Sequence, residues 1–506
     1  MPTSMRTGFT IYLLLLILHI GLVWWLPYFP TQDGPSHLYN MMILRDLLHG
    51  GKEWGQFFTH QLHPVPNLAF EAISYPLLGI LSPFVVEKIF VTLYIILSGS
   101  AIPFFLLTFG RSPFPLAFMV FPVMFNFTLM MGFYSYVIAI PLFLLSASIA
   151  WKYRNCSTVR KFVVFNSAGI IIFFAHLIPF IFYMMFLLAT ALSESIGVRN
   201  AREKIARLSL ILSPSIILLL LYFLTSRGTG ANMEVIRATI DYLFTDLFFF
   251  STVTFAPLQM VPAYLFSNLV IVGVYMSCKD FISSGWRFSE KAPEKRALFI
   301  FVAMLVLVYF LMPFRFAGGS YFNERLPWVI LLAGLPLLFL KETETRNKFL
   351  AFAGIGTTLL FFCCNVYLFS IQCGTVEEYL GGLRTELTKG AYVMNYRTRD
   401  AGWTRIDVLA HAASYYGIYK GTVDIGNYEA GLPYFPVQFR KTLPPLPPRK
   451  QIEFRPEKIE WSLYPCISYL FGWDLDPIER KRLGLEFHII KEEGRLTVWE
   501  RNSVTP

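Results

Sequence analysis

Two residues that could carry acid–base chemistry, Asp33 and His37, stand directly after a long apolar run, IYLLLLILHIGLVWWLPYF. A carboxylate in that place can act as a general base, which typically contributes about 10² to 10⁴-fold to a rate. His37, Met41 and Arg45 follow at the spacing of a helix that begins at a Gly-Pro pair, so all three point the same way. The simpler interpretation is that Asp33 only caps this helix and that His37 is an interfacial residue.

The composition predicts that the surrounding elements lie in a membrane. Of the 506 residues, 55% are apolar, 17% are aromatic and only 15% are charged. The apolar fraction is higher, and the charged fraction lower, than in soluble chains. A membrane span needs about twenty apolar residues, so the chain can hold many spans and a separate soluble domain. The net charge of +10 lies mostly in short loops between apolar runs, and it gives no support for nucleic-acid binding.

Basic residues predict the orientation of the spans, because cytoplasmic loops keep Lys and Arg. Six short segments hold eighteen of them, against seven in the longer segments between. We therefore predict an α-helical polytopic protein of the plasma (inner) membrane, with a cytoplasmic N-terminus and about eleven spans. The spans are expected near residues 8–28, 84–108, 113–131, 135–151, 162–178, 180–197, 208–225, 259–277, 297–313, 326–340 and 349–370. A cleavable signal peptide is the alternative for the first run, but no small-residue cleavage site follows it.

The composition changes after Cys373, where charged residues become frequent and apolar runs shorten. This change predicts a transmembrane domain at 1–373, with its first outer loop at 29–83, and a small α/β domain on the outer face at 374–506. GAYVMNYR, LEFHIIKEE and RLTVWER indicate strands, IDVLAHAASYYGIY a helix and LPPLPPRK an extended connector. Cys373 and Cys466 share the outer side and could form a disulfide there, although their spacing does not demand one.

The predicted topology gathers many ionisable residues on the outer face. Such groups cost about 2.5 to 3.5 kcal/mol each at the bilayer centre, so they usually face water-filled cavities, and we treat them as candidates for one shared site. They are Asp33, His37, Arg45, His60, His63, His176, Arg315, Glu324 and Arg325. Asp33 and the first three histidines could hold a divalent metal, but their spacing matches no zinc pattern, so no cofactor is predicted. His176 stands at a tight turn, where it lines the cavity or hydrogen-bonds a carbonyl released before Pro179.

The loop MPFRFAGGSYFNERLPW, residues 312–328, is the candidate phosphate site. Arg315 and Arg325 offer a planar fork of donors that matches phosphate oxygens, and the Gly-Gly pair before Tyr321 lets the backbone approach a ligand closely. The alternative is an interfacial Arg325 paired with Glu324 or with lipid headgroups. The preceding outer segment, EVIRATIDYLFTDLFFF, has the pattern of an interfacial helix.

An Asp just past the first span, in a long outer loop with surface-lying helices, resembles the GT-C superfamily of membrane glycosyltransferases. Protein O-mannosyltransferases and lipid A aminoarabinose transferases share this outline, although in the best-known members a Glu follows the Asp, where this chain has Gly34. The resemblance implies a polyprenyl-phosphate sugar as donor and a lipid, glycan or protein acceptor outside the membrane. Asp33 would then be the base that inverts the anomeric centre, with substrate contacts from His37, Arg45, His63, His176, Arg315, Tyr321 and Arg325.

Two other classes of function remain open from the sequence. A transporter or flippase for a lipid-linked glycan would have ionisable or broken elements at mid-membrane in both halves, whereas the polar residues here gather outside. A non-catalytic membrane subunit would bind an outer partner through residues 374–506.

Overall fold

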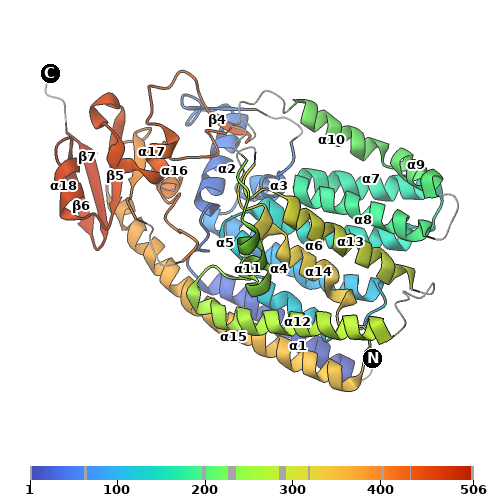
Figure 1. Cartoon of the computed structure of the whole chain (residues 1–506). Coiled ribbons are helices and arrows are strands. Elements are labelled where there is room, and N and C mark those ends of the chain that lie inside the picture. The colour runs from blue at the N-terminus through green and yellow to red at the C-terminus, as the bar shows by residue number, and fades with distance from the viewer. Residues whose placement is uncertain are drawn as a thin grey trace.

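The computed structural model describes residues 3–61, 65–196, 201–225, 235–283, 292–316, 319–399, 404–432 and 435–502. Within these ranges the chain forms a bundle of helices with a strand-containing domain packed on one end (Figure 1). The first described helix, α1, lies with α12 and α15 along one side of the bundle, and the last described strand, β7, lies in the strand domain.

Seven helices in the described ranges are long and apolar enough to cross a membrane. They are α1 (Thr3–Trp25), α4 (Pro83–Thr108), α6 (Tyr134–Tyr153), α7 (Thr158–Ala175), α8 (Leu177–Ser195), α12 (Met260–Ser283) and α15 (Glu344–Leu380). An eighth candidate is the pair α9 (Ala201–Ile211) and α10 (Ser213–Thr225), which is bent by 68°. The helical membrane class is therefore confirmed.

Eleven long spans are not confirmed. The predicted span at 113–131 is the 3₁₀-helix η1 (Leu116–Val123) followed by α5 (Phe127–Met130), and the one at 326–340 is α14 (Pro327–Gly334) followed by η5 (Leu335–Leu337). Pro122 in the first and Pro336 in the second remove backbone donors that a continuous helix needs. At 297–313, α13 (Pro293–Leu311) does form, but its first turn contains three charged residues, so it is not among the seven apolar helices.

The strand domain is built on a five-stranded mixed sheet in the order β3-β2-β5-β7-β6. Its strands are β3 (Val423–Asp424), β2 (Tyr392–Tyr396), β5 (Ile467–Trp473), β7 (Leu496–Arg501) and β6 (Phe487–Glu493). The three sequence-predicted strands correspond to β2, β6 and β7, and Gly494 makes the turn between the last two at φ +59°. The predicted helix is shorter than expected, since only α16 (Ala413–Lys420) is helical; α17 (Arg449–Phe454) and α18 (Pro477–Leu483) complete the domain.

The strand domain packs against the segment between α1 and α4. Strand β1 (Phe58–His60) pairs antiparallel with β4 (Val437–Phe439), and α16 packs against α2 (Gly34–Leu48). The Tyr39 hydroxyl donates to the carbonyl of Thr422 at 2.9 Å. A Cβ at Gly417 would lie 2.4 Å from the Tyr39 ring, so this close approach needs glycine.

The remaining elements are short helices. They are α3 (Ala69–Leu77), α11 (Ile240–Phe249), η2 (Ser251–Val253), η3 (Pro257–Gln259), η4 (Asn323–Arg325), η6 (Gly381–Arg384), η7 (Pro456–Lys458) and η8 (Trp461–Leu463). Helix α11 begins only at Ile240, and Ile236 of the segment predicted as an interfacial helix instead forms a β-bridge with Arg315; α11 exposes Ile240, Phe244 and Phe248. All six cysteines are free: the Cys373 thiol donates to the carbonyl of Tyr28 and that of Cys466 to the carbonyl of Pro445, so the suggested disulfide is absent.

Candidate active site between the helices and the strand domain

Asp33 lies between α1 and α2 and is 6% exposed. Although it precedes α2, its side chain makes no capping hydrogen bond to that helix, so the simpler interpretation from the sequence is wrong. One carboxylate oxygen accepts from Gln32 Nε2 at 3.3 Å and lies 3.5 Å from His411 Nε2, and the other accepts from the Tyr428 hydroxyl at 3.4 Å. The carboxylate is therefore turned toward the strand domain.

Two glycines allow the backbone around Asp33 to be this compact. Gly132 has φ +91°, and a Cβ there would lie 2.8 Å from Asp33 Cβ. The Asp33 N–H donates to the neighbouring carbonyl of Met131 at 3.1 Å. A Cβ at Gly34 would lie 2.3 Å from Glu87 Oε1, so the carboxylate of Glu87 occupies the space that a side chain at position 34 would need. The buried carboxylate beside Gly34 thus comes from α4.

His37 is the cation at the centre of this acidic cluster, which we define as Asp33, Glu71, Glu87 and Glu429. Its Nδ1 lies 2.9 Å from Glu429 Oε1, and its Nε2 lies 3.0 Å from the carbonyl oxygen of Gly132. Both partners present an acceptor oxygen to the ring, an arrangement that favours the protonated imidazole. Burial lowers the pKa of His37, but the carboxylates of Glu429, Asp33 and Glu71 outweigh it and raise the pKa to about 9.

The pKa values of Asp33, His411 and Glu71 are all shifted, but not in the same direction. Burial, with help from Glu429, raises the pKa of Asp33 to about 7 although His37, Gln32 and Tyr428 lower it. Burial lowers the pKa of His411 to about 3 against the attraction of Asp407, so this ring is neutral. The pKa of Glu71 is likewise raised by burial to about 7. A carboxyl with a pKa near neutrality beside a fixed cation is suited to taking up a proton.

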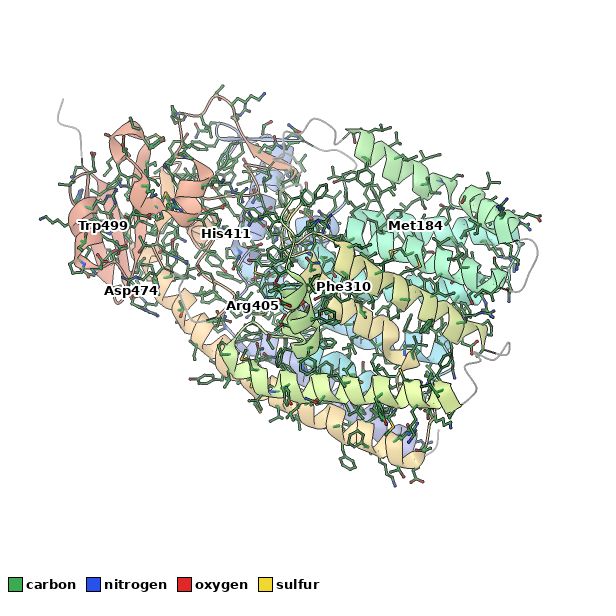
Figure 2. The ribbon with its side chains drawn as sticks, in the orientation of Figure 1. Met184, Phe310, Arg405, His411, Asp474 and Trp499 are labelled. Atoms are coloured by element: carbon green, nitrogen blue, oxygen red, sulfur yellow. The ribbon has the colours of Figure 1, made fainter. Side chains whose placement is uncertain are left out.

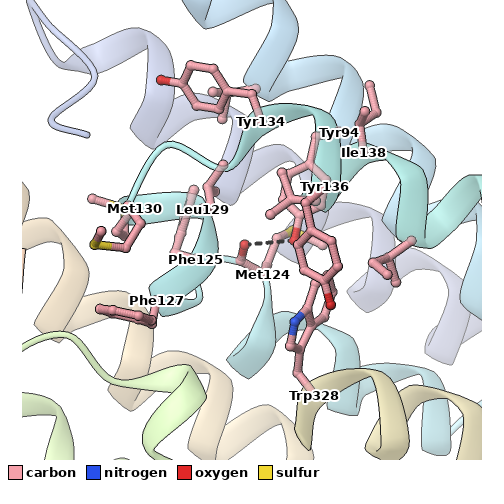
Figure 3. Close-up of a cluster of buried hydrophobic side chains, with 14 of the residues drawn as sticks. Tyr94, Met124, Phe125, Phe127, Leu129, Met130, Tyr134, Tyr136, Ile138 and Trp328 are labelled. Carbon is pink, nitrogen blue, oxygen red and sulfur yellow. Dashed lines mark hydrogen bonds between the residues drawn. The ribbon is translucent and has the colours of Figure 1, made fainter. Parts of the chain in front are cut away.

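The segment 127–136, which runs from α5 into α6, connects Asp33 to the arginine loop. The Arg325 guanidinium lies 4.2 Å over the Phe133 ring, next in sequence to Gly132, and 5.4 Å from the ring of Tyr136. The Tyr136 hydroxyl donates to the Arg325 carbonyl at 2.5 Å. Figure 3 shows Tyr136 beside Trp328 of α14, with Phe127 and Met130 on the neighbouring part of the segment.

Tyr321 and Arg315 lie in the same loop. Tyr321 has φ +63° and packs its ring 5.4 Å from that of Phe127. Burial raises the pKa of its phenol, as do the charges of Glu324 and Asp33, while Arg405 and Arg315 lower it. The Tyr321 hydroxyl therefore lies between carboxylate and guanidinium charges. Arg315 Nε donates to Ser320 Oγ at 3.0 Å.

Arg405 is a site residue that sequence reasoning missed. It pairs with Glu324, whose side chain is buried, donates to the Ser251 carbonyl at 2.8 Å and lies 4.1 Å over the Phe127 ring. Figure 2 shows Arg405 and His411 where the strand domain meets the bundle. The other missed residues are Gln32, Glu71, Glu87, His411, Tyr428 and Glu429. The only sequence signal for three of them was the Tyr- and Gly-rich stretch HAASYYGIYKGTVDIGNYEAGLPYFP.

Of the three other predicted contact residues, Arg45 lies away from Asp33, His176 lies next to Tyr136, and His63 is not described by the structure. Arg45 is about three helical turns after Asp33, where its Nη1 donates to the carbonyl of Leu78 at 3.0 Å. His176 caps α8, since its Nδ1 accepts from the Ile178 N–H at 3.1 Å, and its ring lies 5.2 Å from that of Tyr136, which also contacts Arg325. His63 lies outside the described residues. Among the residues described, no three His, Cys, Asp or Glu side chains are placed to hold one metal ion.

Replacing Arg405 with methionine is expected to destabilise the protein by about 2 kcal/mol. Breaking a buried ion pair from one side costs about 3 to 5 kcal/mol, and we reduce this because the Arg405 side chain is 34% exposed. Methionine keeps the contact with Phe127, so the loss reflects the charge left on Glu324. The measurement is the melting temperature in detergent.

Two further variants test the physical reason for that loss. Adding Glu324→Gln to Arg405→Met should restore most of the stability, because no buried charge then remains without its cation. Lys348→Met, which breaks an exposed pair with Glu344, should change little. Equal losses in Lys348→Met and Arg405→Met would contradict the explanation.

The chain is similar in structure to two crystal structures of ArnT from Cupriavidus metallidurans, one in the apo state and one bound to undecaprenyl phosphate. Both alignments have a TM-score of 0.50; sequence identity is 10% for the first and 8% for the second. They cover 97% and 99% of this chain and 98% of each ArnT chain. No family model matches the sequence, and neither does any curated protein. The likeness shows that this chain has the fold of the two ArnT structures, and the fold class predicted from the sequence is confirmed.

Proposed function

We propose that the protein transfers a sugar from a polyprenyl-phosphate-linked donor to an acceptor outside the membrane, with inversion at the anomeric carbon and Asp33 as general base. The observation that carries the proposal is the Asp33 carboxylate, which is buried and does not cap its helix. Asp33 and Arg325 both contact segment 127–136. The ArnT structure with undecaprenyl phosphate supports a lipid phosphate of that class as the leaving group.

In this reaction Asp33 takes the proton of the acceptor nucleophile, a lipid, glycan or protein hydroxyl, as it attacks the anomeric carbon. The new bond forms on the face opposite the lipid phosphate, the carbon–oxygen bond to phosphate breaks, and its electron pair leaves with the phosphate. Arg325 and Arg315 would hold the charge that develops on the phosphate oxygens, and Tyr321 would contact the same group. His37 stabilises the anionic form of Asp33. No step needs a metal or a cofactor.

The proposal also sets an orientation in the plasma (inner) membrane. Asp33, the arginine loop and residues 374–506 would face outward, and the N-terminus would lie in the cytoplasm. Membrane lipids would surround the seven long helices.

The test is a transfer assay with purified full-length protein in nanodiscs. Labelled polyprenyl-phosphate sugars that differ in the sugar are supplied with membrane lipid, glycan and peptide acceptors, and release of the lipid phosphate is followed with and without a chelator. Release with at least one donor, unchanged by chelation, is the expected result. No release with any donor would leave the lipid-linked glycan transporter or the non-catalytic subunit as the function.

The pH dependence of transfer should report the Asp33 carboxyl. Its pKa is raised to about 7, chiefly by burial, so below that pH it is protonated and cannot accept a proton. We therefore expect kcat/KM to rise with pH through about 7 and then to level off. His37→Gln removes a cation that lowers the pKa of Asp33, so the rising limb should move to higher pH. A limb that stays in place in His37→Gln would show that Asp33 is not the titrating base.

A further inference from the structure

The strand domain contains a cavity of about 500 Å³ away from the acidic cluster. It lies where β2 and β5 begin and β7 ends, and no member of the acidic cluster lines it. Its wall includes Thr388, Lys389, Tyr392, Ser468, Tyr469 and Asn502. The volume is within the range of about 300 to 1,000 Å³ that small-ligand sites occupy.

A β-bulge turns one of these residues out of the regular ladder. Tyr392 pairs with Ile467, but the next residue of β2, Val393, pairs with Tyr469, so Ser468 is an extra residue in β5. Bulges re-aim side chains and are common beside binding sites. The backbone is therefore irregular at the place where Ser468 lines the cavity.

The polar groups of the wall suit a ligand with many hydroxyls rather than an anion. The hydroxyls of Thr388 and Tyr469 lie 3.2 Å apart, and Tyr392 adds a half-buried aromatic ring. The cations are already engaged, since Lys389 Nζ lies 3.0 Å from Glu53 and Arg501 donates to the carbonyl of Trp461 at 2.7 Å. Hydroxyl donors and acceptors beside an aromatic ring, with no uncommitted guanidinium, match the polar edges and apolar faces of a sugar ring.

We infer that this cavity is a saccharide-binding site, distinct from the candidate active site. Its hydroxyl and amide groups pair with sugar hydroxyls, and Tyr392 covers the apolar face of one ring. The inference does not depend on transfer by Asp33, because a glycan can bind here whatever chemistry occurs at the acidic cluster.

The test measures glycan binding by the fluorescently labelled full-length protein in nanodiscs. An array of neutral, amino-sugar and acidic oligosaccharides identifies the best-bound glycans, and their dissociation constants are then measured in solution. Ser468→Trp fills the cavity from β5, and Asn502→Trp fills it from the exposed end of β7. Both variants should weaken binding by about tenfold or more. Ser462→Trp, an exposed position of the same domain outside the cavity, should bind as the unmodified protein does.

Three results would overturn the inference. The unmodified protein could retain no glycan on the array. Ser468→Trp and Asn502→Trp, with melting temperatures near that of the unmodified protein, could bind glycan as well as it does. Asp33→Asn could lose glycan binding, which would place the bound glycan at the acidic cluster instead. Transfer activity without array binding would leave the proposed function standing and remove only this site.

Discussion

Asp33→Asn is expected to lower kcat for sugar transfer by about 10² to 10⁴-fold, the usual contribution of a positioned general base. The amide has nearly the shape of the carboxylate and can still accept from Gln32, but it cannot take up a proton from the acceptor. Folding should be little affected, because the Asp33 side chain does not cap α2 and no helix end loses a partner. The measurement is steady-state release of lipid phosphate.

The matched control is Asp424→Asn, the same change at another buried carboxylate of the junction. Asp424 is 2% exposed and accepts from Ser414 Oγ at 2.7 Å and from the Gly426 N–H at 2.8 Å, so it is structural. Its variant should lose stability and keep kcat, whereas the Asp33 variant should keep its melting temperature and lose kcat. Undiminished turnover in Asp33→Asn, or the same loss in both variants, would exclude Asp33 as the base.

The part of the candidate site that the sequence predicted is local in the chain. Asp33 and His37 stand in one short stretch after an apolar run, and Arg315, Tyr321 and Arg325 stand in one loop. Residue type and spacing suffice there, because a helix start and a fork of donors are properties of neighbouring residues. In the structure Asp33 and Arg325 both contact segment 127–136, and no local sequence pattern predicted these contacts.

Much of the rest comes from the strand domain, and no sequence pattern connects it with Asp33. His411, Tyr428 and Glu429 reach Asp33 or His37 because β1 pairs with β4 and α16 packs on α2. These contacts join positions nearly 400 residues apart, so neither period nor composition records them. A prediction that places residues 374–506 in a domain of their own gives no reason to expect their side chains beside Asp33 and His37.

The predicted number of spans is not confirmed, for a related reason. The runs at 113–131 and 326–340 are as apolar as a membrane span, but in the structure they are short helical pieces, and the side chains of η1 and most of those of α14 are buried. Hydropathy cannot separate a buried short helix from a crossing one. Pro122 and Pro336 were the sequence features that indicated short helical pieces in these two runs.

The second large effect is expected at Arg325, where methionine should lower kcat by about 10² to 10³-fold, the cost of removing one preorganised donor from developing charge. The guanidinium lies over the rings of Phe133, Tyr136 and Phe322, and methionine keeps this apolar packing. The fold should therefore survive while the charge is lost. Arg325→Lys keeps the charge without the planar fork, so its kcat should lie between those of Arg325→Met and the unmodified protein.

Arg315→Met is the comparison within the same loop. Arg315 is half-buried and donates to Ser320, so its loss should reduce kcat less than that of Arg325. Undecaprenyl phosphate, added as a competing product, should inhibit Arg325→Met less strongly than the unmodified protein, because the anion has lost a donor. Inhibition of equal strength in both proteins, with kcat unchanged, would mean that the lipid phosphate leaves through another part of the site and that Arg325 only holds segment 127–136 in place.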